Sequence, residues 1–177
     1  MFRVNTELVL GGARSGKSSH AEYLAQTSGL DVIYIATATA GDEEMAARIA
    51  HHQQTRPNHW ALVEEAVDLA GAIRRHSLPD NCLLIDCLTL WLTNCLFNDE
   101  LALDWPGQKA ALLAALAEAQ GRVILVSNEV GQGIVPMGAM SRRFVDESGW
   151  LHQTIARQVD RVTFVTAGIP QILKGEA

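Results

Sequence analysis

Short apolar runs alternate with longer stretches of helical periodicity along the whole chain. Runs rich in β-branched and other apolar residues predict strands, whereas apolar residues spaced three and four apart predict helices. The predicted strands cover residues 7–12, 31–37, 60–65, 81–88, 122–130 and 161–169. The predicted helices cover residues 17–29, 42–54, 66–76, 89–97, 105–120 and 138–159.

This regular alternation favours an α/β fold in which right-handed crossovers join parallel strands and place helices on both faces of the sheet. The run 81–88 is apolar nearly throughout, as expected of a central strand that is buried on both faces. A chain of 177 residues has the length of one domain. We therefore predict a single α/β domain over residues 1–177, with a mostly parallel sheet.

The composition indicates a soluble globular protein, with 48% hydrophobic and 19% charged residues. A net charge of −6 gives no basic footprint for nucleic acid, and no apolar run approaches the length of a membrane span. Cys82, Cys87 and Cys95 are odd in number, lie in apolar stretches and form no CxxC pair, which is typical of reduced, buried thiols. We expect a cytoplasmic protein without a secretory leader.

The turn after the first predicted strand reads GGARSGKS (11–18) and fits the phosphate-loop pattern G-x-x-x-x-G-K-S. The helix that follows it adds the positive end of its dipole, Lys17 can reach the β- and γ-phosphates, and Ser18 can coordinate Mg²⁺. The alternative is a chance match in a glycine-rich turn, which the strand–loop–helix context disfavours. The expected nucleotide-binding residues here are Gly11, Gly12, Ala13, Arg14, Ser15, Gly16, Lys17 and Ser18.

An acidic residue, Asp86, comes near the end of the apolar strand in the sequence LLIDC. A carboxylate in such a place needs a partner, and Mg²⁺ held directly or through water is the expected one in a nucleoside-triphosphate site. The alternative is that Asp86 caps the helix that follows, since aspartate is a good N-cap. Ser18 and Asp86 are thus the predicted metal ligands.

Two histidines, His51 and His52, stand side by side in the helical stretch RIAHHQQTRP (48–57). Neighbours on a helix are turned about 100° apart and cannot share a face, which argues against a paired metal site. The residues alone leave open a chance pairing, a packed histidine beside an exposed one, or a single reactive histidine with a neighbour.

Several motifs together resemble the bifunctional adenosylcobinamide kinase / adenosylcobinamide-phosphate guanylyltransferase family of cobalamin biosynthesis, over nearly the whole chain. The phosphate loop alone is unspecific, but the strings RI-x-HH-x-x-x-RP-x-HW and NEVG-x-GIVP are specific in combination. The motifs that carry the resemblance are GGARSGKS (11–18), YIATA (34–38), DEEMAARIAHHQQTRPNHW (42–60), LLIDCLTLWLTN (83–94) and SNEVGQGIVP (127–136).

The resemblance implies a P-loop NTPase-like fold. It also implies two catalytic residues: His51, which becomes covalently guanylylated, and Lys17, which binds the phosphates of the nucleotide. Neutral imidazole is a competent nucleophile, and with an unperturbed pKa of about 6.5 much of it is neutral at pH 7. The resemblance also implies nucleotide contacts at Ala36, Thr37, Ala38, His52, Gln53, Gln54, Thr55, Arg56, Glu64 and Asp86.

Ordinary structural explanations stand beside these roles. His51 could be a surface histidine of an amphipathic helix, Arg56 a solvated cation at a helix end, and Glu64 a charge at a strand end. Glu129 could position the acceptor or belong to a structural turn, and Arg142 with its neighbour could reach anions or have no special role.

The resemblance implies two reactions that use ATP or GTP with Mg²⁺. The first phosphorylates adenosylcobinamide, and the second transfers GMP from GTP to adenosylcobinamide phosphate to give adenosylcobinamide-GDP. It also implies a homo-oligomer, namely a trimer. Two rival functions fit the residues: a plain small-molecule P-loop kinase without a covalent nucleotide, and a nucleotide-dependent binding module without transferase chemistry.

Overall fold

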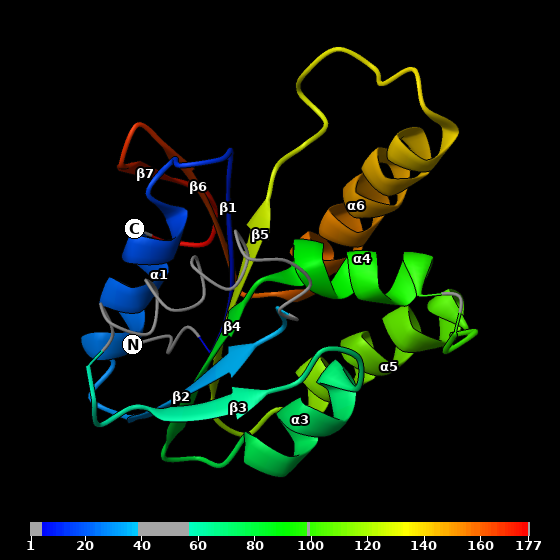
Figure 1. Ribbon diagram of the computed structural model, residues 1–177. Coiled ribbons are helices and arrows are strands. Elements are labelled where there is room, and N and C mark those ends of the chain that lie inside the picture. The colour runs from blue at the N-terminus through cyan, green and yellow to red at the C-terminus, as the bar shows by residue number, and fades with distance from the viewer. Residues whose placement is uncertain (1–4, 39–56, 99, 177) are drawn as a thin grey trace.

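A seven-stranded sheet organises the described part of the chain in the computed structural model, which covers residues 5–38, 57–98 and 100–176. Figure 1 shows the strands in the order β3-β2-β4-β5-β1-β6-β7. The strands are β1 (Thr6–Gly11), β2 (Asp31–Ala36), β3 (Ala61–Glu64), β4 (Asn81–Asp86), β5 (Arg122–Asn128), β6 (Arg161–Thr166) and β7 (Ile169–Lys174). The helices are α1 (Lys17–Gln26), α3 (Leu69–His76), α4 (Leu88–Phe97), α5 (Trp105–Glu118) and α6 (Ala139–Gln158).

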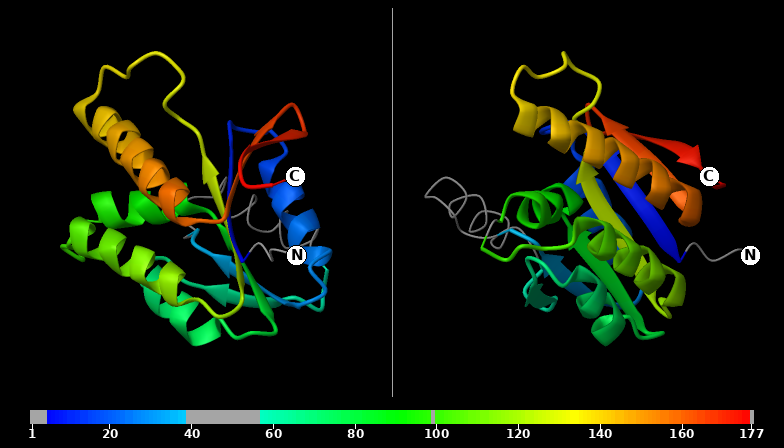
Figure 2. Two further views of the ribbon diagram at one scale, coloured as in Figure 1. Left: turned by 180° about the vertical axis from the view of Figure 1, so that it is seen from behind. Right: turned by 90° about the vertical axis from the view of Figure 1, so that its right-hand side faces the viewer.

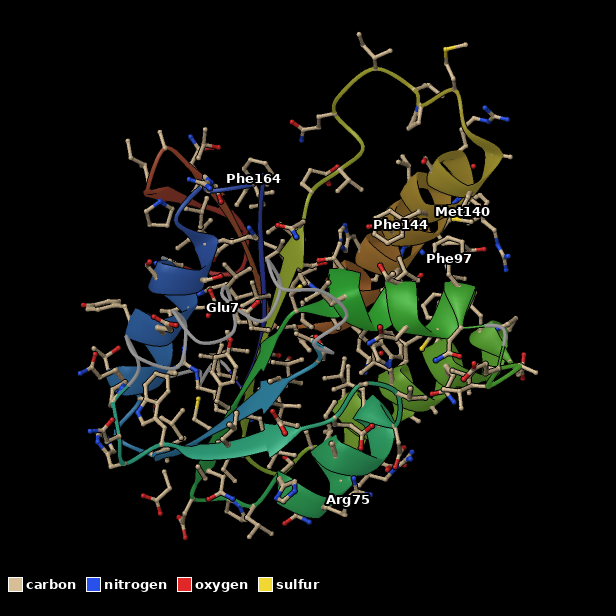
Figure 3. All side chains as sticks on the ribbon, in the orientation of Figure 1. Glu7, Arg75, Phe97, Met140, Phe144 and Phe164 are labelled. Atoms are coloured by element: carbon tan, nitrogen blue, oxygen red, sulfur yellow. The ribbon has the colours of Figure 1, made fainter. Side chains whose placement is uncertain are left out.

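Helices cover both faces of this sheet, as the sequence predicts (Figures 1 and 2). The larger core lies between the sheet and α3, α4, α5 and α6, while α1 packs on the opposite face with the smaller core. Phe97 of α4 and Phe144 of α6 pack against the larger core (Figure 3). The mostly parallel α/β prediction is confirmed, because each pairing from β3 across to β6 is parallel.

The alternation of side chains along the central strands explains why both layers form. Leu8 and Leu10 of β1 point into the larger core, whereas Val9 between them points into the smaller one. In β4, the residues from Cys82 to Ile85 are all buried, which accounts for the uninterrupted apolar run in the sequence. All three cysteines are free and buried, also as expected.

The last strand of the sheet is absent from the sequence prediction, which ended with one strand over 161–169. The chain instead turns back at Ala167 and Gly168, whose φ angles are 52° and 77°, and β7 pairs antiparallel with β6. Positive φ at both turn positions suits a tight hairpin, because it matches the twist of the strands. Every residue of β7 is exposed, so its pattern carries no inward-facing alternation to detect.

Two helix ends also differ from the prediction for local hydrogen-bonding reasons. Helix α3 begins at Leu69 rather than 66, because the Glu65 carboxylate accepts backbone N–H bonds from Val67 and Asp68. Asp68 then caps the helix by accepting the N–H of Gly71. Helix α1 ends at Gln26 with Thr27 as its C-cap, so residue 29 is not the cap.

Three further elements end two residues before their predicted ends: β4 at Asp86, β5 at Asn128 and α5 at Glu118. The predicted helix over 42–54 lies outside the described residues. None of the helices in the described ranges has the length and apolar character needed to cross a membrane.

Candidate functional site

The carboxyl ends of three neighbouring strands bring the main candidate residues to one edge of the sheet. Strand β5 lies between β1 and β4, with Gly11 opposite Asn128 and Asp86 opposite Val126. The phosphate loop after β1, the carboxylate that ends β4 and the loop after β5 therefore share this edge. In open α/β sheets this is where ligands bind.

The phosphate loop has the strand–loop–helix geometry that its sequence predicts. Gly16 is the N-cap of α1 and adopts φ 92°, a left-handed conformation that favours glycine. Lys17 is the first residue of that helix, so the positive end of the helix dipole points at the loop. The Gly168 N–H donates to the Ser15 carbonyl at 2.7 Å, which ties the loop to the turn before β7.

Space around two loop glycines is too small for a side chain. A Cβ on Gly11 would lie 2.4 Å from the Ser15 hydroxyl oxygen and 2.7 Å from the backbone oxygen of Val165. A Cβ on Gly16 would lie 3.0 Å from the Cα of Gly168. The glycines of the motif therefore allow β6 and the following turn to approach the loop closely.

The side chain of Lys17 folds back over the loop. It is buried, and its ammonium group donates to the Gly12 carbonyl at 3.0 Å. Burial lowers the pKa of Lys17, while the nearby charge of Asp86 acts to raise it. The electrostatic coupling places Lys17 and Asp86 on the same site, and the bond to Gly12 is one that a phosphate oxygen can replace.

Asp86 is half-buried and does not act as the cap of the helix that follows. The N-cap of α4 is Cys87, and this helix start receives no side-chain cap hydrogen bond. The helix-cap interpretation is therefore not supported, and the carboxylate stays available as a ligand.

The residues near Asp86 fit a magnesium ion carried in by a nucleotide. The Ser18 hydroxyl and the Asp86 carboxylate are hard oxygen donors, of the kind Mg²⁺ combines with substrate phosphates and water. An ion held mainly by phosphates needs no cluster of three protein ligands, and the described ranges contain none.

The segment after β2 ends at the same edge. Ala36 pairs in register with Asp86 on one side and Glu64 on the other. The Thr37 hydroxyl is buried, donates to the Cys87 carbonyl at 2.7 Å and accepts the Cys87 N–H at 2.9 Å. The backbone of Thr37 is used as well, since its N–H donates to the Asp86 carbonyl and its carbonyl accepts from the side-chain amide of Asn94. Thr37 therefore ties the end of β2 to the end of β4 and to α4.

The structure thus gathers one part of the predicted site and leaves another untested. Residues 11–18, 36–38, 64 and 86 lie along the carboxyl edge of the sheet. The remaining predicted contacts lie outside the described residues, and their roles stay predictions: His51, His52, Gln53, Gln54, Thr55 and Arg56.

A buried histidine at this edge escaped the sequence analysis. His152 of α6 lies with its Nε2 2.7 Å from the Ser127 hydroxyl oxygen and its Nδ1 3.9 Å from the Glu129 carboxylate. Burial lowers the pKa of His152, and the charge of Glu129 opposes this shift. A polar residue on the apolar stripe of α6, between the buried Leu151 and Ile155, is the signal that could have revealed it.

Arg142, for which the sequence left open an anion contact or no special role, contacts the backbone of the loop before α6. Arg142 is exposed near the start of α6 and donates to the backbone carbonyls of Pro136 and Met137. It therefore holds the end of the loop that leads from β5 into α6.

The chain is similar to known proteins over nearly its whole length. The family model for cobinamide kinase / cobinamide phosphate guanyltransferase matches residues 7–173. The bifunctional adenosylcobalamin biosynthesis protein CobP of Pseudomonas aeruginosa is 58% identical over 171 residues, which cover 96% of this chain and 98% of that protein. The corresponding protein CobU of Escherichia coli is 42% identical over 174 residues, covering 92% and 96% of the two chains.

Solved structures of lower identity show the fold alone. An ATPase of a bacterial type III secretion system aligns with a TM-score of 0.58 at 13% identity, covering 92% of this chain and 51% of that one. The RadB recombinase aligns with a TM-score of 0.52 at 14% identity, covering 90% and 73%. These likenesses confirm a P-loop NTPase fold. With the phosphate loop in place and relatives matched over nearly their full length, the chain belongs to the cobinamide kinase / cobinamide phosphate guanyltransferase family, bifunctional enzymes of adenosylcobalamin biosynthesis that are both kinases and nucleotidyltransferases.

Proposed function

We propose that the chain phosphorylates adenosylcobinamide with ATP or GTP and then transfers GMP from GTP to the product through a guanylyl group on His51. The product of the second reaction is adenosylcobinamide-GDP. The observation that carries the proposal is the phosphate loop at the carboxyl edge of the sheet, with Lys17 at the start of α1 and Asp86 at the end of β4, in a chain of this family.

In the kinase reaction, the loop after β1 holds the triphosphate against the start of α1. Lys17 releases the Gly12 carbonyl and binds phosphate oxygens, which neutralises the charge that develops on them. Ser18 and Asp86 would hold Mg²⁺, and the bound ion would supply positive charge against the phosphates. The acceptor hydroxyl attacks the γ-phosphorus in line, and the nucleoside diphosphate leaves.

In the nucleotidyl transfer, a ring nitrogen of neutral His51 attacks the α-phosphorus of GTP and pyrophosphate leaves. A phosphate oxygen of the acceptor then attacks the same phosphorus, and the bond to the histidine breaks. The covalent intermediate divides one difficult displacement into two easier ones. Both reactions need a triphosphate in a positively charged loop. One loop can therefore hold the nucleotide for both, with the γ-phosphorus facing the acceptor in the first reaction and the α-phosphorus facing His51 in the second.

The decisive experiment is incubation with α-labelled GTP followed by denaturing electrophoresis. We expect a protein-bound label that is labile in acid and stable in alkali, as a phosphoramidate is. His51→Ala should abolish this label and the transferase reaction but keep kinase activity, because phosphoryl transfer to a hydroxyl does not need that nucleophile.

His52→Ala is the matched control, because neighbours on the helix predicted over 42–54 would point about 100° apart. It should keep the label. Label lost only in His52→Ala would move the nucleophile by one residue, and label kept in both variants would refute a covalent site at this pair. A wild-type protein that phosphorylates cobinamide without any label would be a plain kinase, and one that binds nucleotide without a product would be a binding module.

We also propose that the enzyme works in the cytoplasm as a homo-oligomer, namely a trimer, without a nucleic-acid partner. Reduced buried cysteines and a net charge of −6 support the compartment and the lack of a nucleic-acid partner. Ile134 and Met137 are exposed on the loop before α6, and Met140 is exposed on the first turn of that helix (Figure 3), where an interface would cover them. Light scattering on Ile134→Ser/Met137→Ser should give a smaller particle than the wild type; an equal mass would refute this interface.

A further inference from the structure

We propose that Glu129 is the general base that removes the proton from the acceptor hydroxyl in the kinase reaction, and that His152 positions its carboxylate. This inference rests on the proposed kinase reaction and adds a group that takes the proton.

The place of Glu129 in the sheet is the first argument. It follows directly after β5, the strand between the phosphate-loop strand β1 and the Asp86 strand β4. Its backbone N–H donates to the carbonyl of Gly11, the first residue of the loop, at 2.9 Å. A γ-phosphoryl group held by Lys17 lies above this edge, so the hydroxyl that attacks it must come close to the end of β5.

The Glu129 carboxylate is held at this edge and still open to a ligand. One of its oxygens accepts the N–H of Gly131, and the other lies 3.9 Å from Nδ1 of His152. About a fifth of the side chain, 21%, remains exposed. A carboxylate that a backbone N–H holds at one oxygen, with an imidazole near the other, and that stays partly open suits a base that must meet a substrate hydroxyl.

The imidazole of His152 is itself fixed from behind by Ser127. Its Nε2 lies 2.7 Å from the Ser127 hydroxyl oxygen, and both residues are almost fully buried. If the hydroxyl donates to Nε2, the ring carries its proton on Nδ1, on the side of Glu129. Burial lowers the pKa of His152 and so favours the neutral ring. A neutral ring can orient the Glu129 carboxylate without neutralising the negative charge that makes it a base.

The same three residue types serve as a hydrolytic triad in other proteins, but burial excludes that function here. The Ser127 side chain is only 1% exposed, so its hydroxyl cannot reach an external carbonyl group. Only the Glu129 end of the arrangement opens to solvent, which assigns the chemistry to the carboxylate.

The proton balance separates the two reactions. In the kinase step, the acceptor oxygen bonds to the γ-phosphorus, the bond from that phosphorus to the β–γ bridging oxygen breaks, and the hydroxyl proton passes to the Glu129 carboxylate. The nucleoside diphosphate leaves, and the proton then returns to solvent. The acceptor of the nucleotidyl transfer is a phosphate oxygen that is already ionised at neutral pH, so this step needs no such base.

The test measures both activities of Glu129→Gln, with cobinamide and cobinamide phosphate supplied separately as acceptors. The amide can still accept the Gly131 N–H but cannot take a proton. We expect kinase kcat to fall on the order of 10²- to 10⁴-fold, with the nucleotide KM and the transferase rate within a few fold of wild type. Asp146→Asn removes the same charge from an exposed position of α6 and should leave both activities unchanged.

An unchanged kinase kcat in Glu129→Gln, or an equal loss of both activities, would overturn the assignment. A wild-type protein without kinase activity would overturn the proposed function itself, which is a different result. Because Glu129 is partly exposed, this variant should fold, and its thermal unfolding provides the check.

Two substitutions of His152 test its positioning role. Asn places an amide nitrogen near the position of Nδ1 and keeps a donor toward Glu129, whereas Gln reaches toward Ser127 and loses that donor. His152→Gln should lower kinase kcat at constant KM, and His152→Asn should restore part of it. Equal kinase rates in two folded variants, or the reverse order, would refute positioning through Nδ1.

Discussion

Replacing Gly11 by alanine tests how closely β6 supports the phosphate loop. The new Cβ would lie 2.7 Å from the backbone oxygen of Val165 and 2.4 Å from the Ser15 hydroxyl oxygen. The hydroxyl can rotate away, but the Val165 oxygen belongs to the sheet, where Gly11 and Val165 are paired in register. The strands must therefore separate locally, and such overpacking costs about 1–3 kcal/mol.

For a chain of this size, each kcal/mol lowers Tm by about 2–4 °C, so Gly11→Ala should lower Tm by roughly 2–12 °C. Urea unfolding without nucleotide should show the same loss as a lower midpoint at a constant slope. Gly12→Ala is the matched control, since nothing lies within 4 Å of a Cβ there and its stability should change by less than about 0.5 kcal/mol. Equal stabilities of the two variants would refute the argument that close approach of β6 requires the first glycine.

Three further predictions concern charged groups. Lys17→Ala should weaken nucleotide binding about 10- to 150-fold and impair both activities, since a donor to charged phosphate oxygens contributes about 1.5–3 kcal/mol. Calorimetry with a non-hydrolysable triphosphate measures the affinity, and a near-normal value would show that Lys17 does not bind the phosphates. Asp86→Asn should raise the Mg²⁺ concentration for half-maximal activity while Tm stays near that of wild type, and an unchanged titration would argue against a metal ligand. Burial alone would raise the pKa of Asp160, but hydrogen bonds from Thr6 and Asn5 lower it below its ordinary value. Its stabilising contribution is therefore present above about pH 4 and lost as the pH falls through the lowered pKa, so Asp160→Asn should flatten the acid side of a stability–pH curve from urea unfolding.

The parts of the fold that follow from local chemistry were predictable from the sequence. Apolar runs such as 81–88 mark strands that are buried on both faces, and GGARSGKS marks a strand–loop–helix junction with few alternatives. The edge strand β7 was not predictable from periodicity, because a fully exposed strand has no buried face to impose a period. Its local signal is Gly168, for which a positive φ carries no steric cost, whereas Ala167 adopts φ 52° despite its Cβ.

The residues of the candidate site also differ in whether they have a local sequence signal. Lys17 is recognisable from the spacing of the phosphate-loop motif, and Asp86 is recognisable as a charged residue in an apolar run. His152 lies 25 residues from Ser127 along the chain, and only the packing of α6 against the sheet brings them together. Contacts of this kind depend on tertiary structure, so a sequence can indicate Glu129 in its loop without indicating the residue that holds it.

The hydrogen bond from Gly168 to Ser15 joins two segments that are far apart in the sequence and are therefore synthesised at different times. The ribosome makes residues 11–18 long before the turn at 167–168. Until that turn leaves the exit tunnel, the loop lacks both the N–H that holds the Ser15 carbonyl and the β6 strand beside Gly11. A nascent chain therefore cannot complete its phosphate loop before β6 and this turn have emerged, so full nucleotide binding cannot precede their synthesis.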